Sequence, residues 1–302
     1  MVERLKIAVA KARAQRARVA AGAVADGGVP ADVYGLPQSV SPGSPPVEDA
    51  ACAADGTGPI PPATVDAAWT ALEPVELNPA HLERNRIITH DRTDPAHAAF
   101  DVLRTRILRV FKKHGWTRLG ITSPSKGCGK TFVASNLAFS LARHAECRTV
   151  LLDLDLRLPS LSKVLGVGQI EPIDWFLSGD VEPERFLHRS GENLALGLSA
   201  KKTPNPAETL LAPTAAEALA RMHARLAPDI VIYDLPPMLA ADDVLGFLPQ
   251  LDCVLLVVGG GKTRPDEVTE CERLLADQTH LLGVLMNKAE DASTSRYGYS
   301  AA

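Results

Sequence analysis

The sequence predicts an α/β protein with a mostly parallel central sheet and helices on both faces, preceded by a disordered N-terminal region. Beyond residue 117, strand-like runs alternate with helical stretches, which is the order of parallel strands joined by crossover helices. Some of these runs, such as 150–152 and 230–232, are apolar at every position, as expected of strands covered on both faces. In residues 26–64, Pro and Gly are frequent and apolar periodicity is absent.

Composition limits the class of protein. The 302 residues are 46% hydrophobic and 23% charged, with a formal net charge of −4, which excludes collagen-like and wholly disordered chains and disfavours a global nucleic-acid binder. The five cysteines form no CxxC pair and are interpreted as free thiols of a reducing compartment. No apolar run reaches the roughly 18–20 residues of a membrane span, and residues 1–6 lack the apolar core of a signal peptide. We therefore expect a cytoplasmic protein.

The N-terminal region is predicted in two parts. Residues 1–25 are expected to form a basic helix, which is either solvated and frayed or in contact with a membrane surface or a partner. Residues 26–64 hold eight Pro and six Gly, so 26–89 is predicted as a disordered linker whose last part is loosely ordered.

The remaining helices and strands are predicted from apolar periodicity and from residues that begin or end such elements. Asp94 and Pro95 give the N-cap and first position of a helix, and Phe100, Leu103 and Ile107 follow on one face up to Gly115. Strands are predicted at 117–122, 148–153, 193–198, 229–234, 252–258 and 281–287, and helices at 131–144, 214–226 and 265–277.

A phosphate-binding loop is predicted between the first strand and its helix. Gly127 and Gly129 let the backbone turn its N–H groups toward phosphate oxygens, and the helix that follows adds its positive end. Lys130 can reach the β- and γ-phosphates, and the Thr131 hydroxyl can bind Mg²⁺. Pro124 stands where the GxxxxGK(S/T) pattern has its first glycine. The loop predicts a P-loop NTPase that binds ATP and Mg²⁺ through Gly127, Cys128, Gly129, Lys130, Thr131 and Phe132.

Carboxylates follow two further strands. Asp153 and Asp155 lie at i and i+2 and therefore point to the same side, where one can hold the water shell of a metal and the other can accept a proton. Asp234 follows an apolar run and fits a Walker B carboxylate that orients Mg²⁺. Taken without the P-loop, the first pair would be read equally well as a solvated acidic turn.

The C-terminal end carries two more candidates. Asn287, at the end of the last predicted strand, can pair with the edge of adenine, or it is simply a polar strand terminator. Tyr297 and Tyr299 lie in a tail, 291–302, that has neither helix nor strand pattern.

These motifs together resemble the bacterial tyrosine kinases (BY-kinases) of capsule and exopolysaccharide biosynthesis, within the group of partitioning and septum-site P-loop ATPases. Residues 153–160 are close to the family's DxDxRxPS, residues 205–211 to its NPxELL, and residues 234–237 to its DxPP. The resemblance covers about 90–300 and implies a kinase domain at 90–290. It implies that Asp153 activates the acceptor hydroxyl, that Asp155 and Asp234 serve the metal, that Arg157 stabilises phosphate charge, and that Tyr297 and Tyr299 are phosphorylated in trans.

The chain departs from its relatives at two motifs. Ser125 stands where partitioning ATPases have a second lysine, with Lys126 one place off, which favours the kinase branch. The family's ExxRxxR motif would fall on Ala98, Asp101 and Arg104, of which only the arginine matches, so a ring of the family type is not predicted.

The resemblance also implies a function and a partner. It implies an autokinase that regulates polysaccharide polymerisation or export, activated by a membrane-bound polysaccharide copolymerase at the inner face of the membrane, with no nucleic-acid partner. Two alternatives stay open: a nucleotide-switched positioning ATPase, and a non-catalytic scaffold that binds ATP. Acceptor tyrosines in the tail favour the kinase over the positioning ATPase.

Overall fold

The computed structural model describes residues 62–89, 97–168, 170–240 and 242–289. Four predicted features lie outside the described residues: the basic helix at 1–25, the first part of the linker, the helix start at Asp94 and Pro95, and the tail with Tyr297 and Tyr299.

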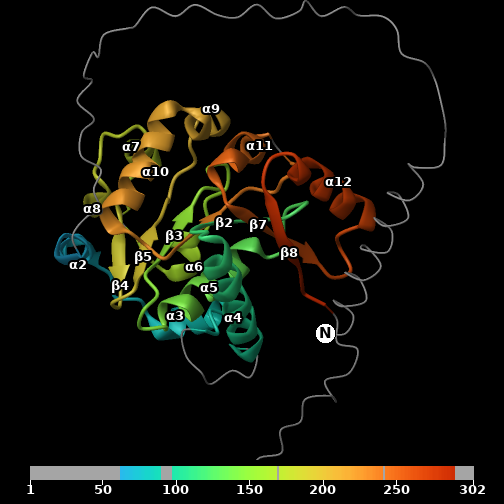
Figure 1. The fold of residues 1–302 in the computed structure, drawn as a ribbon. Helices are drawn as coiled ribbons and strands as arrows, with labels where there is room; N and C mark the ends of the chain where they lie inside the picture. The colour runs from blue at the N-terminus through green and yellow to red at the C-terminus, as the bar shows by residue number, and fades with distance from the viewer. Residues whose placement is uncertain (1–61, 90–96, 169, 241, 290–302) are drawn as a thin grey trace, which may run out of the picture. The chain divides into compact units, whose positions relative to one another are not determined.

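One sheet runs through the described part of the chain in the order β1-β4-β5-β3-β6-β2-β7-β8 (Figure 1). Every neighbouring pair is parallel except β4 and β5, so the predicted mostly parallel sheet is confirmed. The strands are β1 (Glu73–Pro74), β2 (Arg118–Thr122), β3 (Thr149–Asp153), β4 (His188–Ser190), β5 (Leu194–Gly197), β6 (Ile230–Asp234), β7 (Cys253–Gly259) and β8 (His280–Asn287).

Helices cover both faces of the sheet because successive strand residues point to opposite sides. Val150 and Leu152 of β3 pack into one hydrophobic cluster, whereas Leu151 packs into the other. The second cluster holds α3 (Pro79–Arg84), α4 (His97–His114), α5 (Lys130–Ala142) and α6 (Leu161–Leu165). The first holds α2 (Pro62–Ala71), α7 (Ile173–Leu177), α8 (Pro183–Phe186), α9 (Pro206–Leu211), α10 (Pro213–Leu226), α11 (Asp243–Phe247) with the 3₁₀ turn Leu248–Gln250, and α12 (Pro265–Ala276).

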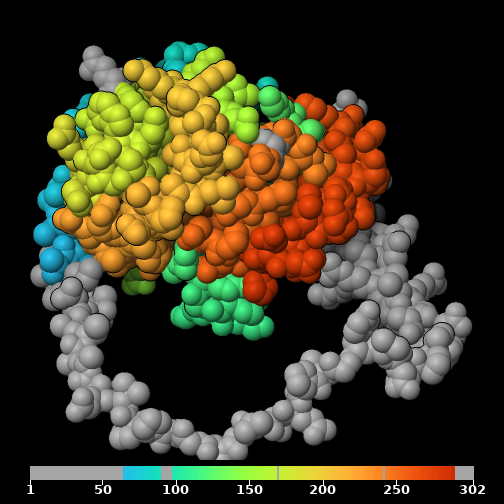
Figure 2. Space-filling model, turned by 90° about the horizontal axis from the view of Figure 1, so that it is seen from above, coloured from blue at the N-terminus to red at the C-terminus, as the bar shows by residue number. Residues whose placement is uncertain are grey.

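The elements on the two sides of the central strands come from different parts of the sequence. Residues 170–226, lime to gold, lie on one side, and residues 243–288, orange to red, lie on the other (Figures 1 and 2). Within the described residues, no helix is long and apolar enough to span a bilayer.

Residues 62–89 correct the predicted linker. They form α2, β1 and α3, and the side chains of Trp69, Leu72, Leu82 and Ile87 are almost fully buried. The Trp69 indole N–H donates a hydrogen bond to the carbonyl of Leu226 over 2.7 Å. The physical reason is helical spacing of three apolar residues, at 65, 69 and 72, which gives this short segment a face to bury.

The strands that precede the predicted functional residues are neighbours. β6 lies between β3 and β2, and Asp153 and Asp234 are directly paired in the register of β3 and β6. Because these strands are parallel, the segments that follow them share one edge of the sheet, where ligands bind in open α/β folds.

Candidate functional site

The loop 123–129 has the backbone conformation that an anion cradle needs. Gly127 and Gly129 have φ of +79° and +92°, a region that other residues rarely adopt. Helix α5 begins at Lys130, so its unpaired first-turn N–H groups face the same space as the loop. The start of the loop, where Pro124 replaces the usual glycine, is held by the N–H of Met238, which donates to the carbonyl of Ser123 over 2.8 Å.

Lys130 lies among the carboxylates that follow β3 and β6. Its Nζ is 2.7 Å from Oδ2 of Asp155 and 3.5 Å from Oδ1 of Asp234. Burial by itself lowers the pKa of Lys130, but the carboxylates of Asp234 and Asp155 outweigh burial, so the pKa is raised and the ammonium stays charged. The structure therefore brings together three of the predicted site residues from three separate segments.

Thr131 completes this cluster. Its hydroxyl donates to Oδ2 of Asp234 over 2.6 Å and is 3.0 Å from the Ser160 hydroxyl. Burial raises the pKa of Asp234, while Lys130 and Thr131 oppose that rise. A hydroxyl and two carboxylates are hard oxygen donors of the kind that Mg²⁺ prefers, so the donor set of Thr131, Asp155 and Asp234 fits that ion.

Asp153, like Asp234, is a fully buried carboxylate of the site. Its Oδ2 accepts the backbone N–H groups of Ser160 and Leu161 over 2.8 and 2.9 Å, and Oδ1 accepts that of Asp155 over 3.3 Å. Burial, followed by the charge of Asp234, raises the pKa of Asp153 to about 8. These hydrogen bonds hold the loop 154–161 to Asp153, and the role of Asp153 as a base stays a prediction.

Arg157 is directed to a partner that sequence reasoning missed. Its Nη2 donates to Oδ1 of Asp243 over 2.8 Å, and Nε bonds the other oxygen of the same carboxylate. The Arg157 side chain is 47% exposed, whereas that of Asp243 is 1% exposed. Asp243 is an ordinary acidic residue at the start of a short helix, and no sequence pattern marks it as the partner of Arg157. The predicted contact of Arg157 with phosphate stays a prediction.

The remaining predicted contacts lie around the loop. Asn287 donates its amide N–H to the carbonyl of Cys128 over 2.9 Å, which makes it a neighbour of the loop; its contact with adenine stays a prediction. The Phe132 ring packs edge-to-face on Phe100 of α4 with centroids 5.8 Å apart, and its contact with a nucleotide stays a prediction. Burial raises the pKa of Cys128, but hydrogen bonds with Thr263 and Ser125 outweigh burial and lower it.

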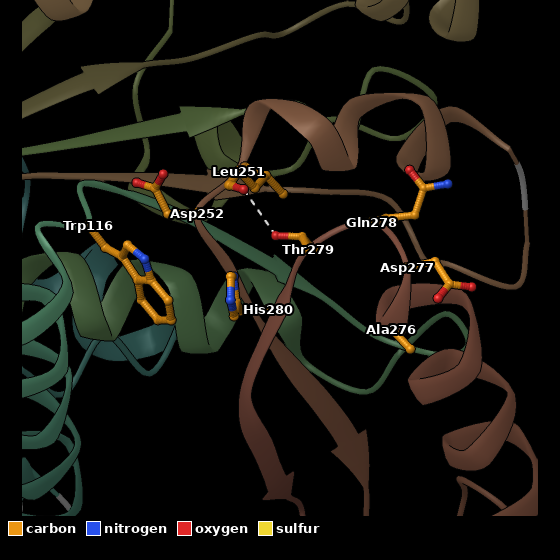
Figure 3. A pocket seen from close by; sticks show the side chains of 8 residues that line it. All are labelled: Trp116, Leu251, Asp252, Ala276, Asp277, Gln278, Thr279 and His280. Carbon is orange, nitrogen blue, oxygen red and sulfur yellow. Dashed lines mark hydrogen bonds between the residues drawn. The ribbon is translucent and has the colours of Figure 1, made fainter. Parts of the chain in front are cut away.

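A hollow lies at the opposite edge of the sheet from this site (Figure 3). Its lining residues precede β2 and β7 or run from the end of α12 to the first residue of β8, and it has a volume of about 430 Å³. The ring of Trp116 stacks on His114 and lies 5.0 Å from that of His280. The Asp252 carboxylate there accepts the backbone N–H groups of Thr117 and Arg118. This hollow therefore contains none of the predicted site residues.

The residues at the position of the family's assembly motif contact their own chain. Arg104 Nη1 is 2.8 Å from Oδ1 of Asp101 and donates to the Ser140 carbonyl of α5 over 3.0 Å. The one matching residue of the motif thus joins α4 to α5.

Comparisons with known proteins give several relatives, although no family model matches the chain. The putative tyrosine-protein kinase EpsB of Ralstonia nicotianae is 31% identical over 211 residues, which are 68% of this chain but only 27% of EpsB. The tyrosine-protein kinase YwqD of Bacillus subtilis is 30% identical over 222 residues, or 73% of this chain and 92% of YwqD.

A solved structure agrees with these relatives. The kinase domain of the Escherichia coli tyrosine kinase ETK superposes with a TM-score of 0.62 at 26% identity, covering 71% of this chain and 84% of that one. Because YwqD is matched over nearly its whole length, and the P-loop and its carboxylates lie together as the resemblance implies, the chain belongs to the bacterial tyrosine kinase family.

Proposed function

We propose that the chain is a protein-tyrosine autokinase that transfers the γ-phosphoryl group of ATP to Tyr297 and Tyr299 of a second copy. The observation that carries the proposal is the cluster in which Lys130, Thr131, Asp155 and Asp234 lie within 3.5 Å of a partner in the same cluster. Three segments of the chain place a cation, a hydroxyl and two carboxylates next to a phosphate-binding loop, and these are the functional groups that phosphoryl transfer requires.

The proposed reaction balances without a further reactant. A bond forms between the tyrosine oxygen and the γ-phosphorus, the bond from that phosphorus to the β-phosphate oxygen breaks, and ADP leaves. The hydroxyl proton passes to a carboxylate of the Asp153 and Asp155 pair. Lys130 exchanges its carboxylate partners for phosphate oxygens of ATP and stabilises charge there. Thr131, Asp155 and Asp234 would hold Mg²⁺, which would supply charge neutralisation at the phosphates.

The biological role and partner are part of the same proposal and rest on the family resemblance. We propose that autophosphorylation regulates exopolysaccharide or capsule polymerisation or export. A membrane-bound polysaccharide copolymerase is the proposed activator, and it would recruit this chain to the inner face of the membrane.

Phosphopeptide mapping tests the proposed activity. Purified protein is incubated with Mg·ATP, with and without the cytosolic segment of the partner, and phosphotyrosine is located by mass spectrometry. We expect phosphate on Tyr297 and Tyr299, and its loss in Lys130→Met. Lys113→Met, a matched change at the end of α4, should keep it.

Two asparagine variants identify the proton acceptor. Loss of phosphotyrosine in Asp153→Asn with Mg·ATP binding retained assigns the base to Asp153. Undiminished phosphotyrosine in Asp153→Asn excludes Asp153 as the base, and weaker Mg·ATP binding in Asp155→Asn supports its role at the metal. ATP turnover without phosphotyrosine in the wild type would contradict the kinase and favour a positioning ATPase. Nucleotide binding with neither turnover nor phosphotyrosine would favour a scaffold.

A further inference from the structure

Three consecutive carbonyl groups of the P-loop are bound from outside the loop. The carbonyl of Lys126 accepts the ammonium of Lys262, and that of Gly127 accepts the ammonium of Lys288 over 2.9 Å. The carbonyl of Cys128 accepts the amide of Asn287 over 2.9 Å. The donors come from the turn after β7 and from the end of β8, which are far from the loop in sequence.

These contacts bear on the part of the loop that faces a ligand. In a trans peptide the C=O of one residue and the N–H of the next point in opposite directions across a rigid plane. Holding the carbonyls of residues 126–128 from outside therefore turns the N–H groups of residues 127–129 toward the inside of the loop. Inward N–H groups are the donors with which such a loop binds phosphate.

The three donor residues are positioned by the pairing of strands β7 and β8. Gly259 and Asn287 are partners in the register of β7 and β8, and the N–H of Gly260 donates to the carbonyl of Asn287 over 2.7 Å. A Cβ on Gly260 would lie 2.7 Å from the backbone oxygen of Lys288, so this close approach requires glycine. Lys288 itself has φ of +55°, an uncommon conformation for a lysine.

We propose that Lys262, Asn287 and Lys288 form a carbonyl clamp, a set of positioning residues that preorganises the P-loop for phosphate. Asn287 acts on the loop and not on the adenine base, and the two lysines act through the carbonyls and not as free charges. This inference rests on the proposed nucleotide binding and adds residues to it. Preorganised donors do not have to be ordered when the ligand binds, so removing the clamp weakens binding of any polyphosphate.

The test compares two ligands that differ in the presence of a base. Isothermal titration calorimetry measures Mg·ATP and Mg·tripolyphosphate binding to the wild type and to Lys262→Ala, Asn287→Ala and Lys288→Ala. We expect each variant to raise the dissociation constants of both ligands by the same factor, about three- to tenfold, which is the effect of losing one hydrogen bond. Thermal unfolding checks that each variant is folded.

Matched variants separate the clamp from its alternatives. Lys126→Ala removes a charge from the same loop but keeps the carbonyl, so it should cost less affinity than Lys262→Ala. Lys262→Arg and Lys288→Arg keep a charged donor and should restore most of the binding.

The inference and the proposed function fail in different ways. A loss confined to ATP in Asn287→Ala would show that Asn287 reads the base. Equal losses in Lys126→Ala and Lys262→Ala would show that charge alone acts. Either result overturns the clamp while the wild type still binds Mg·ATP. Normal ATP binding and normal clamp effects without phosphotyrosine would instead overturn only the proposed kinase activity.

Discussion

Trp69 offers a direct test of the claim that residues 62–89 are part of the folded domain. Its side chain is 2% exposed, and its indole N–H holds the carbonyl that ends α10. Truncating a buried Trp to Ala costs about 3–5 kcal/mol through lost burial and the cavity that remains. The carbonyl of Leu226 also loses its partner, which by itself costs about 1–3 kcal/mol. We therefore expect Trp69→Ala to lower the free energy of unfolding by about 4–8 kcal/mol, the sum of these two costs.

Urea denaturation followed by circular dichroism measures this change, and two variants serve as references. Trp69→Phe keeps most of the apolar volume but loses the hydrogen bond, and should cost about 1–2 kcal/mol. Trp175 is 51% exposed, so Trp175→Ala is a matched substitution that should cost less than about 1.5 kcal/mol. A decrease in the free energy of unfolding below about 1 kcal/mol for Trp69→Ala, or equal decreases for the two tryptophan variants, would refute the reasoning. Residues 62–89 would then be interpreted as a linker, as the sequence predicted.

Other predictions concern contacts near the site and the helix α4. Arg157→Ala leaves the buried carboxylate of Asp243 unpaired and should lower the free energy of unfolding by about 1–3 kcal/mol. In a double-mutant cycle measured by denaturation, Arg157→Ala combined with Asp243→Ala should lower it by less than the sum of the two single changes. In Gly129→Ala, the new Cβ would sit on a backbone with φ of +92° and only 2.1 Å from the side-chain nitrogen of Asn287, so the affinity for Mg·ATP should fall at least about tenfold. Gly283→Ala is the control, because a Cβ there meets no atom within 4 Å, and it should bind Mg·ATP normally in the same titration. Because the guanidinium of Arg104 is bound within its own chain, light scattering should find the purified protein mainly monomeric at micromolar concentration, and a stable ring would contradict this.

Much of the fold was predictable because its central strands carry unambiguous patterns. The strands predicted at 148–153 and 229–234 are adjacent parallel strands in the structure, and the glycines at 127 and 129 have the positive φ that the loop was expected to need. The carboxylates could be placed at one edge because residues that follow parallel strands must lie together.

The rest depended on contacts between segments distant in sequence. The helix signal in 62–72 was outweighed by the Pro-rich sequence before it, and its stability comes from packing with α10. The antiparallel strand β4 is only three residues long, which is too short for a periodic pattern. The partners of Arg157 and Asn287, namely Asp243 and the carbonyl of Cys128, are set by tertiary structure alone.

A mixing experiment tests the central claim, transfer of phosphate from ATP to a tail tyrosine of another copy. The enzyme is the variant with Tyr297→Phe and Tyr299→Phe, which keeps the cluster of Lys130, Asp155 and Asp234. The acceptor is Lys130→Met, which keeps both tyrosines, and intact mass distinguishes the two chains after incubation with Mg·ATP. We predict phosphotyrosine on the Lys130→Met chain only when both proteins are present, at a rate that increases with enzyme concentration. Phosphotyrosine that forms in Lys130→Met alone, or none in the mixture while wild type labels itself at a rate independent of concentration, would contradict transfer in trans by this site.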